Sequence, residues 1–290
     1  MGFIFRVLKK LLIVVLVTVV LVGCVAVGGF FFIKGKYGID VLKTMKELKV
    51  LSQSVDEAEL CPNAFSDDDM VDVQAIVNES VEGFISYTVE HGYSVNFQDL
   101  PDKMTYFIQL TDKQVGALAQ TVVKQEIGGK IAFGGKNVDV ALKQVTFSEI
   151  SENSVLLNTV MSADIKPFKS ELPGGFLRKY IEKYIPDTLY VSSTVKVEKG
   201  IEAFSYTVIH DTLTVNNLNK ADTEDLFRTL DKLLKLGEAS AWNLKIGTAI
   251  TNALIGNEEN NGLAYSLQEI GATGYEFIEE SGVGYFRVVR

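Results

Sequence analysis

The residues of this chain that could act as nucleophiles or general bases are few and widely separated. Its two histidines are His91 and His210, and its two cysteines are Cys24 and Cys61. A histidine activates a cysteine thiol only when folding brings the two side chains within hydrogen-bond distance. His91 lies in a predicted loop and His210 is expected to end a strand, so both are interpreted as surface residues. The sequence therefore predicts a protein that is not an enzyme, and a hydrolase with an unrecognised site is the weaker alternative.

Three short motifs resemble chemical signatures but lack the required context. Ser193-Thr194-Val195-Lys196 matches the Ser-x-x-Lys pattern of penicillin-interacting enzymes, which needs a helix, whereas alternation here predicts a strand with opposite faces. Residues 128–136 are rich in glycine but lack the spacing of a phosphate-binding loop, so turns are expected. Asp67-Asp68-Asp69 lacks the calcium-loop spacing and suits a helix N-terminus, where acids are favourable. No metal site and no cofactor are predicted.

The elements that would position any site alternate between helical and strand periodicity. Helices are expected over residues 38–54, 66–84, 111–128, 174–185, 222–237 and 242–254, because apolar side chains recur there every three or four residues. Two long antiparallel pairs are expected over 137–165 and 188–215, and a terminal hairpin turns at Ser281-Gly282. The alternation slips in phase between Leu142 and Val145, which predicts a β-bulge. The fold class is predicted to be α+β, with long, curved antiparallel strands wrapped on helices.

Two helical stripes could line an apolar groove rather than a filled core. The first lies on residues 174–185 and ends at Pro186, and the second begins at Trp242. Aromatic and branched aliphatic side chains at this spacing form one face of each helix. The ligand-groove candidates are Phe176, Leu177, Tyr180, Ile181, Tyr184, Trp242, Ile246 and Ile250.

A hydrophobic run near the N-terminus predicts membrane attachment. Residues 11–33 contain no charged side chain, and a helix of that length spans a hydrocarbon layer of about 30 Å. Leu21-Val22-Gly23-Cys24 resembles a lipoprotein cleavage site, so a lipid-modified Cys24 is the alternative to an uncleaved helix. The basic N-terminal residues favour a cytoplasmic tail over 1–10. The prediction is a single-pass protein of the cell membrane, with a stalk over 34–65 and an extracytoplasmic domain over 66–290.

Charge excludes some partners of that domain. The whole chain has a net charge of -9, and without residues 1–33 it has 25 bases against 37 acids. Such a domain is predicted to repel nucleic acid and to gain nothing electrostatically from anionic lipid. Its contact with the lipid bilayer is therefore expected to be apolar.

The layout resembles a family of bacterial membrane-anchored proteins. The resemblance covers residues 104–290 and rests on the N-terminal anchor, on Leu110-Thr111-Asp112-Lys113-Gln114-Val115-Gly116-Ala117-Leu118 after a strand, and on the long strand pairs. The closing segment Gly284-Tyr285-Phe286-Arg287-Val288 also contributes. These features are similar to those of YpmS-like proteins of Gram-positive bacteria, which are relatives of tubular lipid-binding domains. The resemblance implies a curved sheet that wraps a helix, an apolar groove for acyl chains and no catalytic residues.

Two functions are consistent with these observations. The first is a non-enzymatic domain, tethered to the membrane, that binds a lipid or another amphiphile in an apolar groove. The alternative is a structural or scaffolding component of a cell-envelope assembly, which would have a filled core and partner envelope proteins. Fold resemblance alone does not choose between them.

Overall fold

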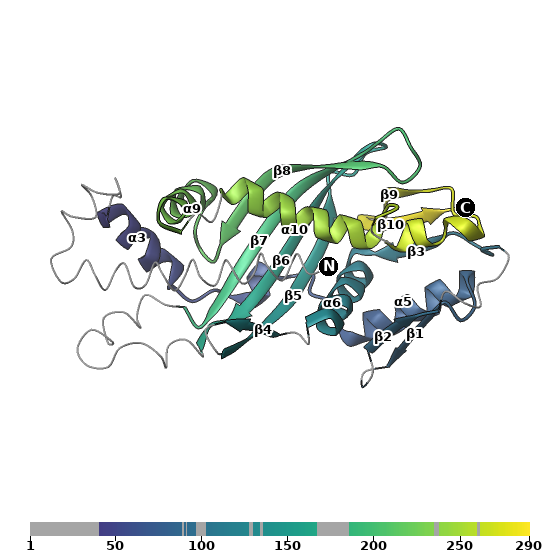
Figure 1. Ribbon diagram of the computed structural model, residues 1–290, viewed down its shortest axis with the longest axis horizontal. Helices are drawn as coiled ribbons and strands as arrows, with labels where there is room; N and C mark the ends of the chain where they lie inside the picture. The colour runs from purple at the N-terminus through teal and green to yellow at the C-terminus, as the bar shows by residue number, and fades with distance from the viewer. Residues whose placement is uncertain are drawn as a thin grey trace.

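The computed structural model describes residues 41–88, 90, 92–96, 103–127, 130–133, 136–166, 186–234, 238–259 and 262–290. These residues form an α+β fold with antiparallel sheets, as predicted (Figure 1). Within these ranges no helix is both long enough and apolar enough to cross a bilayer. The hydrophobic run over 11–33 and the predicted helix over 174–185 lie outside the described residues.

The largest sheet has five antiparallel strands in chain order. They are β4 (Lys130–Phe133), β5 (Lys136–Ser148), β6 (Ser154–Asp164), β7 (Thr188–Lys199) and β8 (Tyr206–Val215). The register of β5 against β6 shifts between Leu142 and Gln144, so the predicted bulge is confirmed. A second shift lies between Thr194 and Val195 in the pairing of β7 with β8. Each extra residue re-aims the side chains that follow it.

One face of this sheet is apolar because alternate residues of each strand point to the same side. Helices α6 (Asp112–Ile127) and α10 (Ala239–Leu254) cover that face, with α6 over β5 and α10 over β7 and β8 (Figure 1). A capping box starts α6, within the helix predicted over 111–128, since Thr111 N–H donates to Gln114 Oε1 (2.8 Å). The buried residues of the two central strands include Val155, Leu157, Met161 and Ala163 in β6 and Leu189, Val191, Val195 and Val197 in β7.

A second sheet has the order β3-β10-β9. Its strands are β3 (Ile108–Thr111), β9 (Gly274–Glu280) and β10 (Val283–Val289). The predicted terminal hairpin is confirmed, and its turn residues Ser281 and Gly282 have φ of 56° and 79°. The two-residue turns whose twist matches that of the flanking strands need positive φ at both central residues. Phe147 of β5 and Phe277 of β9 meet edge to face, with centroids 5.2 Å apart, so the two sheets share one core.

Helix α5 (Asp67–Ser80) begins at the predicted position. The backbone N–H of Ser66 donates to Asp69 Oδ2 (2.7 Å), so the acids over 67–69 serve the helix start. A hairpin of β1 (Ile85–Thr88) and β2 (Gly92–Val95), which the sequence did not predict, packs beside this helix. The short helices α11 (Leu263–Ser266) and η2 (Gln268–Ile270) lead into β9.

At the opposite end of the molecule, α3 (Val41–Leu51) packs against α9 (Lys220–Leu234) (Figure 1). Leu48 and Leu51 of α3 are 0% and 1% exposed and belong to the main core. The four-residue helix α4 (Glu57–Leu60) then lies beside the outer face of the sheet. The folded domain therefore includes α3 and α4, which lie within the range expected to form a stalk, and it begins before residue 66.

Candidate functional site

The second predicted stripe of groove candidates faces the sheet. Trp242, Ile246 and Ile250 lie four residues apart on α10 and are 1%, 2% and 4% exposed. The indole ring of Trp242 meets the ring of Phe227 on α9 edge to face, with centroids 5.8 Å apart. These three side chains therefore join α9 and α10 to the apolar face of the large sheet.

Helix α10 approaches the sheet most closely at Gly247. A Cβ atom placed on this glycine would lie 2.5 Å and 2.7 Å from the two γ-carbons of Val195 on β7. Carbon atoms that are not bonded do not approach so closely, so only a residue without a side chain fits here. At this level no space for an acyl chain exists between α10 and β7.

The first predicted stripe is not placed by the structure. Phe176, Leu177, Tyr180, Ile181 and Tyr184 lie outside the described residues. The structure therefore brings three of the eight candidates together on α10 and does not test the grouping of these five. They stay a prediction from the sequence.

A polar cluster lies under α10, beside the bulge in the pairing of β7 with β8. Asn243 Oδ1 accepts a hydrogen bond from Ser193 Oγ (2.5 Å), and Asn243 Nδ2 lies 2.6 Å from the carbonyl oxygen of Thr194. The same nitrogen lies 2.7 Å from Nδ1 of His210 on β8. Asn243 is 0% exposed, and every one of these contacts ties α10 to the sheet. The cluster therefore fixes the position of the helix.

This arrangement does not activate a nucleophile. The hydroxyl of Ser193 is 2% exposed and donates to an amide oxygen rather than to a base. Lys196 points to the other face of β7, where it pairs with Glu198 (2.6 Å), as the alternation of the strand predicted. The Ser-x-x-Lys interpretation is therefore excluded by geometry. Sequence reasoning missed Asn243 because a single amide beside Trp242 leaves the helical apolar stripe unchanged.

The position of His210 differs from the prediction. The expectation that it ends a strand before Asp211 is wrong, because β8 continues to Val215 through the bulge. Partial burial under α10 lowers the pKa of the His210 imidazole, and the charge of Lys220 lowers it further, while Glu224 and Asp211 oppose the shift. For Asn243 Nδ2 to donate to Nδ1, this nitrogen must carry a lone pair, so the neutral ring fits the cluster.

The free energy of unfolding is expected to fall as the pH is lowered through the titration of His210. Because the pKa of the folded state lies below the unfolded value of about 6.5, the unfolded chain takes up the proton first. The contribution of neutral His210 to the free energy of unfolding is full above about pH 6.5. It is lost as the pH falls through the lower pKa of the folded state. Urea unfolding of the full chain in detergent at a series of pH values measures this loss.

The matched control is His210→Asn, which keeps an acceptor near Nδ1 but cannot be protonated in this range. As the pH falls, the free energy of unfolding of the wild type is expected to decrease more than that of His210→Asn. All other ionisable side chains are the same in both proteins, so their contributions cancel in the comparison. A difference that does not change with pH would show that the cluster accepts the charged ring.

Cys61 lies on the other side of the sheet from His210. Together with Val160 and Tyr190 it forms a small apolar cluster on the outer face, where it is 5% exposed. Burial raises the pKa of the Cys61 thiol, so the reactive thiolate is disfavoured. Glu57 of α4 accepts a hydrogen bond from the Tyr190 hydroxyl (2.5 Å) and pairs with Lys143 (2.8 Å), which holds α4 on the sheet. The structure therefore separates Cys61 and His210.

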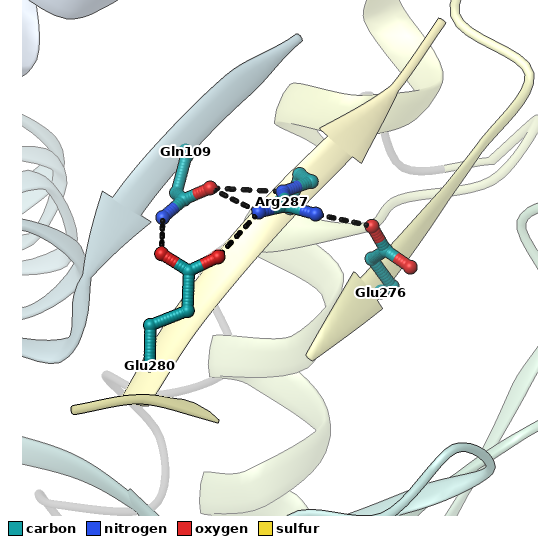
Figure 2. Close-up of polar contacts among 4 residues, drawn as sticks. All are labelled: Gln109, Glu276, Glu280 and Arg287. Carbon is teal, nitrogen blue, oxygen red and sulfur yellow. Dashed lines mark hydrogen bonds and ion pairs between the residues drawn. The ribbon is translucent and has the colours of Figure 1, made fainter. Parts of the chain in front are cut away.

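A second polar network crosses the outer face of the small sheet (Figure 2). The Arg287 guanidinium on β10 donates to Gln109 Oε1 on β3 (2.5 Å and 2.9 Å) and to Glu276 and Glu280 on β9 (3.0 Å each). The Phe107 ring lies 4.7 Å from the guanidinium carbon. One arginine thus joins all three strands, and two carboxylates neutralise its charge. This network holds the three strands together, and its guanidinium is not free to bind an anionic ligand.

In the ranges that the structure describes, no group of three histidine, cysteine or acidic side chains could hold a metal ion. No protein-family model, curated protein or solved structure matches this chain.

Proposed function

We propose that this protein is a non-enzymatic domain, tethered to a membrane through residues 11–33, that binds a lipid or another amphiphile near the end of its large sheet. The attachment rests on the uncharged run of 23 residues, which has the length of a membrane-spanning helix. The expected curved wrap of the sheet around a helix is part of the same proposal. Its location in the cell membrane, with the domain outside, follows from the basic tail over 1–10.

One observation supports this proposal most directly, and it concerns Asn216. Its amide nitrogen donates to the carbonyl oxygen of Leu51, at the end of α3, and to that of Thr188, at the start of β7 (2.8 Å and 3.4 Å). The helix that follows the apolar run and the strand that follows residues 174–185 thus meet at one end of the sheet. The described residues on either side of 167–185 therefore lie at the end of the sheet next to α3, where the membrane is expected.

Trp242 extends the buried apolar contacts of α10 toward the same end. It contacts Phe227 of α9, and Asp225 of α9 forms an ion pair with Lys43 of α3. The close approach of Gly247 to Val195 excludes a ligand deeper along α10. We therefore place the amphiphile at the Trp242 end of the helix, where burial of its hydrocarbon would contribute about 25 cal/mol per Å².

Native mass spectrometry of the full chain, purified from cells in detergent, tests this proposal. The wild type is expected to retain a lipid-sized ligand or to take up added phospholipid. The variant Phe176→Ser/Tyr180→Ser/Tyr184→Ser is expected to lose most of that ligand. As a control, Val71→Ser/Ile201→Ser removes apolar side chains that are 55% and 107% exposed, and it should bind as the wild type does. A wild type that carries no amphiphile and takes up none would overturn the proposal.

Two observations favour the alternative of a scaffolding component. The contact of Gly247 with Val195 and the burial of Trp242, Ile246 and Ile250 are those of a filled core. A scaffold needs a rigid domain rather than a vacant groove. The two functions are distinguished by purification of the wild type. A scaffold should carry no lipid and should co-purify with envelope proteins in a fixed stoichiometry.

A further inference from the structure

The helix nearest to the expected membrane has one buried face and one cationic face. Lys43, Lys46 and Lys49 recur every three residues on α3, and all three side chains are exposed. Residues three apart lie on the same side of a helix, so these lysines form one stripe. The opposite face is packed on the domain and consists of Thr44, Glu47, Leu48 and Leu51, which are 0–7% exposed.

Two of the three lysines of the stripe carry positive charge that no described acid neutralises. Lys43 forms an ion pair with Asp225 of α9 yet keeps half of its side chain exposed. Lys46 and Lys49 form no ion pair with any residue that the structure describes. The acid of the same helix, Glu47, is 4% exposed and lies on the other face. The exposed side of α3 is therefore cationic.

This cationic surface belongs to a steep change of charge along the chain. Residues 34–52 contain five lysines and two acids, whereas residues 53–82 contain nine acids and no lysine or arginine. The acidic helix α5 lies at the other end of the molecule from α3 (Figure 1). The net charge of -9 is the sum over the whole chain and does not describe the exposed face of α3, where the charged side chains are lysines. This face of α3 is the part of the structure at this end that an anionic surface would attract.

We infer that the lysine face of α3 binds the anionic phosphate headgroups of the bilayer to which the chain is attached. Seven residues separate the end of the apolar run at 33 from the start of α3 at 41, and they span at most about 25 Å. The stripe is thus held within reach of the headgroup layer. Each lysine near an anionic membrane surface strengthens binding about fivefold, and salt weakens the effect. The inference rests on the membrane attachment proposed above and is independent of amphiphile binding.

Hydrogen exchange of the full chain tests this inference in nanodiscs of phosphatidylcholine alone or of an equimolar mixture with phosphatidylglycerol. The amides of α3 are expected to exchange at least about fivefold more slowly in the anionic discs. High salt should remove the difference. In Lys43→Gln/Lys46→Gln/Lys49→Gln the two kinds of disc should give the same exchange rate, whereas the arginine triple variant should behave as the wild type does.

The matched control is Lys103→Gln/Lys113→Gln/Lys124→Gln, which removes three other exposed lysines and should leave the difference intact. Two failures are distinguishable. A wild type that enters both kinds of disc but shows equal α3 exchange rates would overturn the headgroup contact alone. A wild type that enters neither kind would overturn the membrane attachment and this inference with it.

Discussion

Replacing Trp242 with alanine is expected to lower the free energy of unfolding by about 3–5 kcal/mol. The indole is 1% exposed and packs against Phe227, so its removal takes away both apolar burial and an aromatic contact. The cost includes the cavity that remains, because α10 is tied to the sheet by Asn243 and cannot collapse into the space. This variant is expected to have one of the two largest effects on stability.

Urea unfolding followed by far-ultraviolet circular dichroism measures this loss, because the variant lacks the only tryptophan of the chain. Trp242→Phe is the matched control and should lose much less, since it keeps a ring against Phe227. The result also bears on function. A loss below about 1 kcal/mol would mean that the surroundings of Trp242 are loosely packed, as a groove requires and a filled core does not.

The sequence predicted the elements whose periodicity is strong. The phase slip between Leu142 and Val145 located the bulge of β5, because an extra residue moves every following side chain to the other face. The turn at Ser281-Gly282 was equally clear, since a small residue and a glycine tolerate positive φ between two apolar strands. Such local signals need no knowledge of the tertiary structure.

The remaining features depend on contacts that sequence patterns do not record. The hairpin of β1 and β2 has four residues per strand and was not predicted, because so short a segment shows little alternation. His210 was misjudged as the last residue of a strand because a bulge breaks the alternation there, although the predicted range 188–215 includes all of β8. Helix α9 starts before the expected residue 222, and Asn219 caps it, since its side-chain oxygen accepts from the backbone N–H of Asp222 (2.9 Å).

The candidate site was predictable only in part for the same reason. The spacing of Trp242, Ile246 and Ile250 predicted that they share one face of a helix, and they do. No spacing could say whether that face would meet a groove or the side chains of a sheet. The decisive residue is Gly247, because a glycine inside a helix is a weak signal until its neighbour across the interface is known.

Gly247→Ala is expected to lower the free energy of unfolding by about 1–3 kcal/mol. Alanine favours the helix by about 1 kcal/mol over glycine, so a loss has to come from the interface. The added methyl group would lie 2.5 Å from one γ-carbon of Val195, which is 0% exposed in β7. A β-branched side chain is stiff about its first torsion angle and cannot turn away easily. Helix α10 must therefore move off the sheet and strain the contacts of Asn243.

A double-mutant cycle with Val195→Ala isolates this contact, with unfolding free energies measured by urea titration of all four proteins. Shortening Val195 removes both γ-carbons that the new methyl group would meet. In that background Gly247→Ala is expected to be neutral or stabilising, which gives a coupling energy of about 1–3 kcal/mol. Equal effects of Gly247→Ala in the two backgrounds would mean that α10 does not touch β7 here. Space for an acyl chain would then extend along the helix, and the amphiphile would no longer be confined to the Trp242 end.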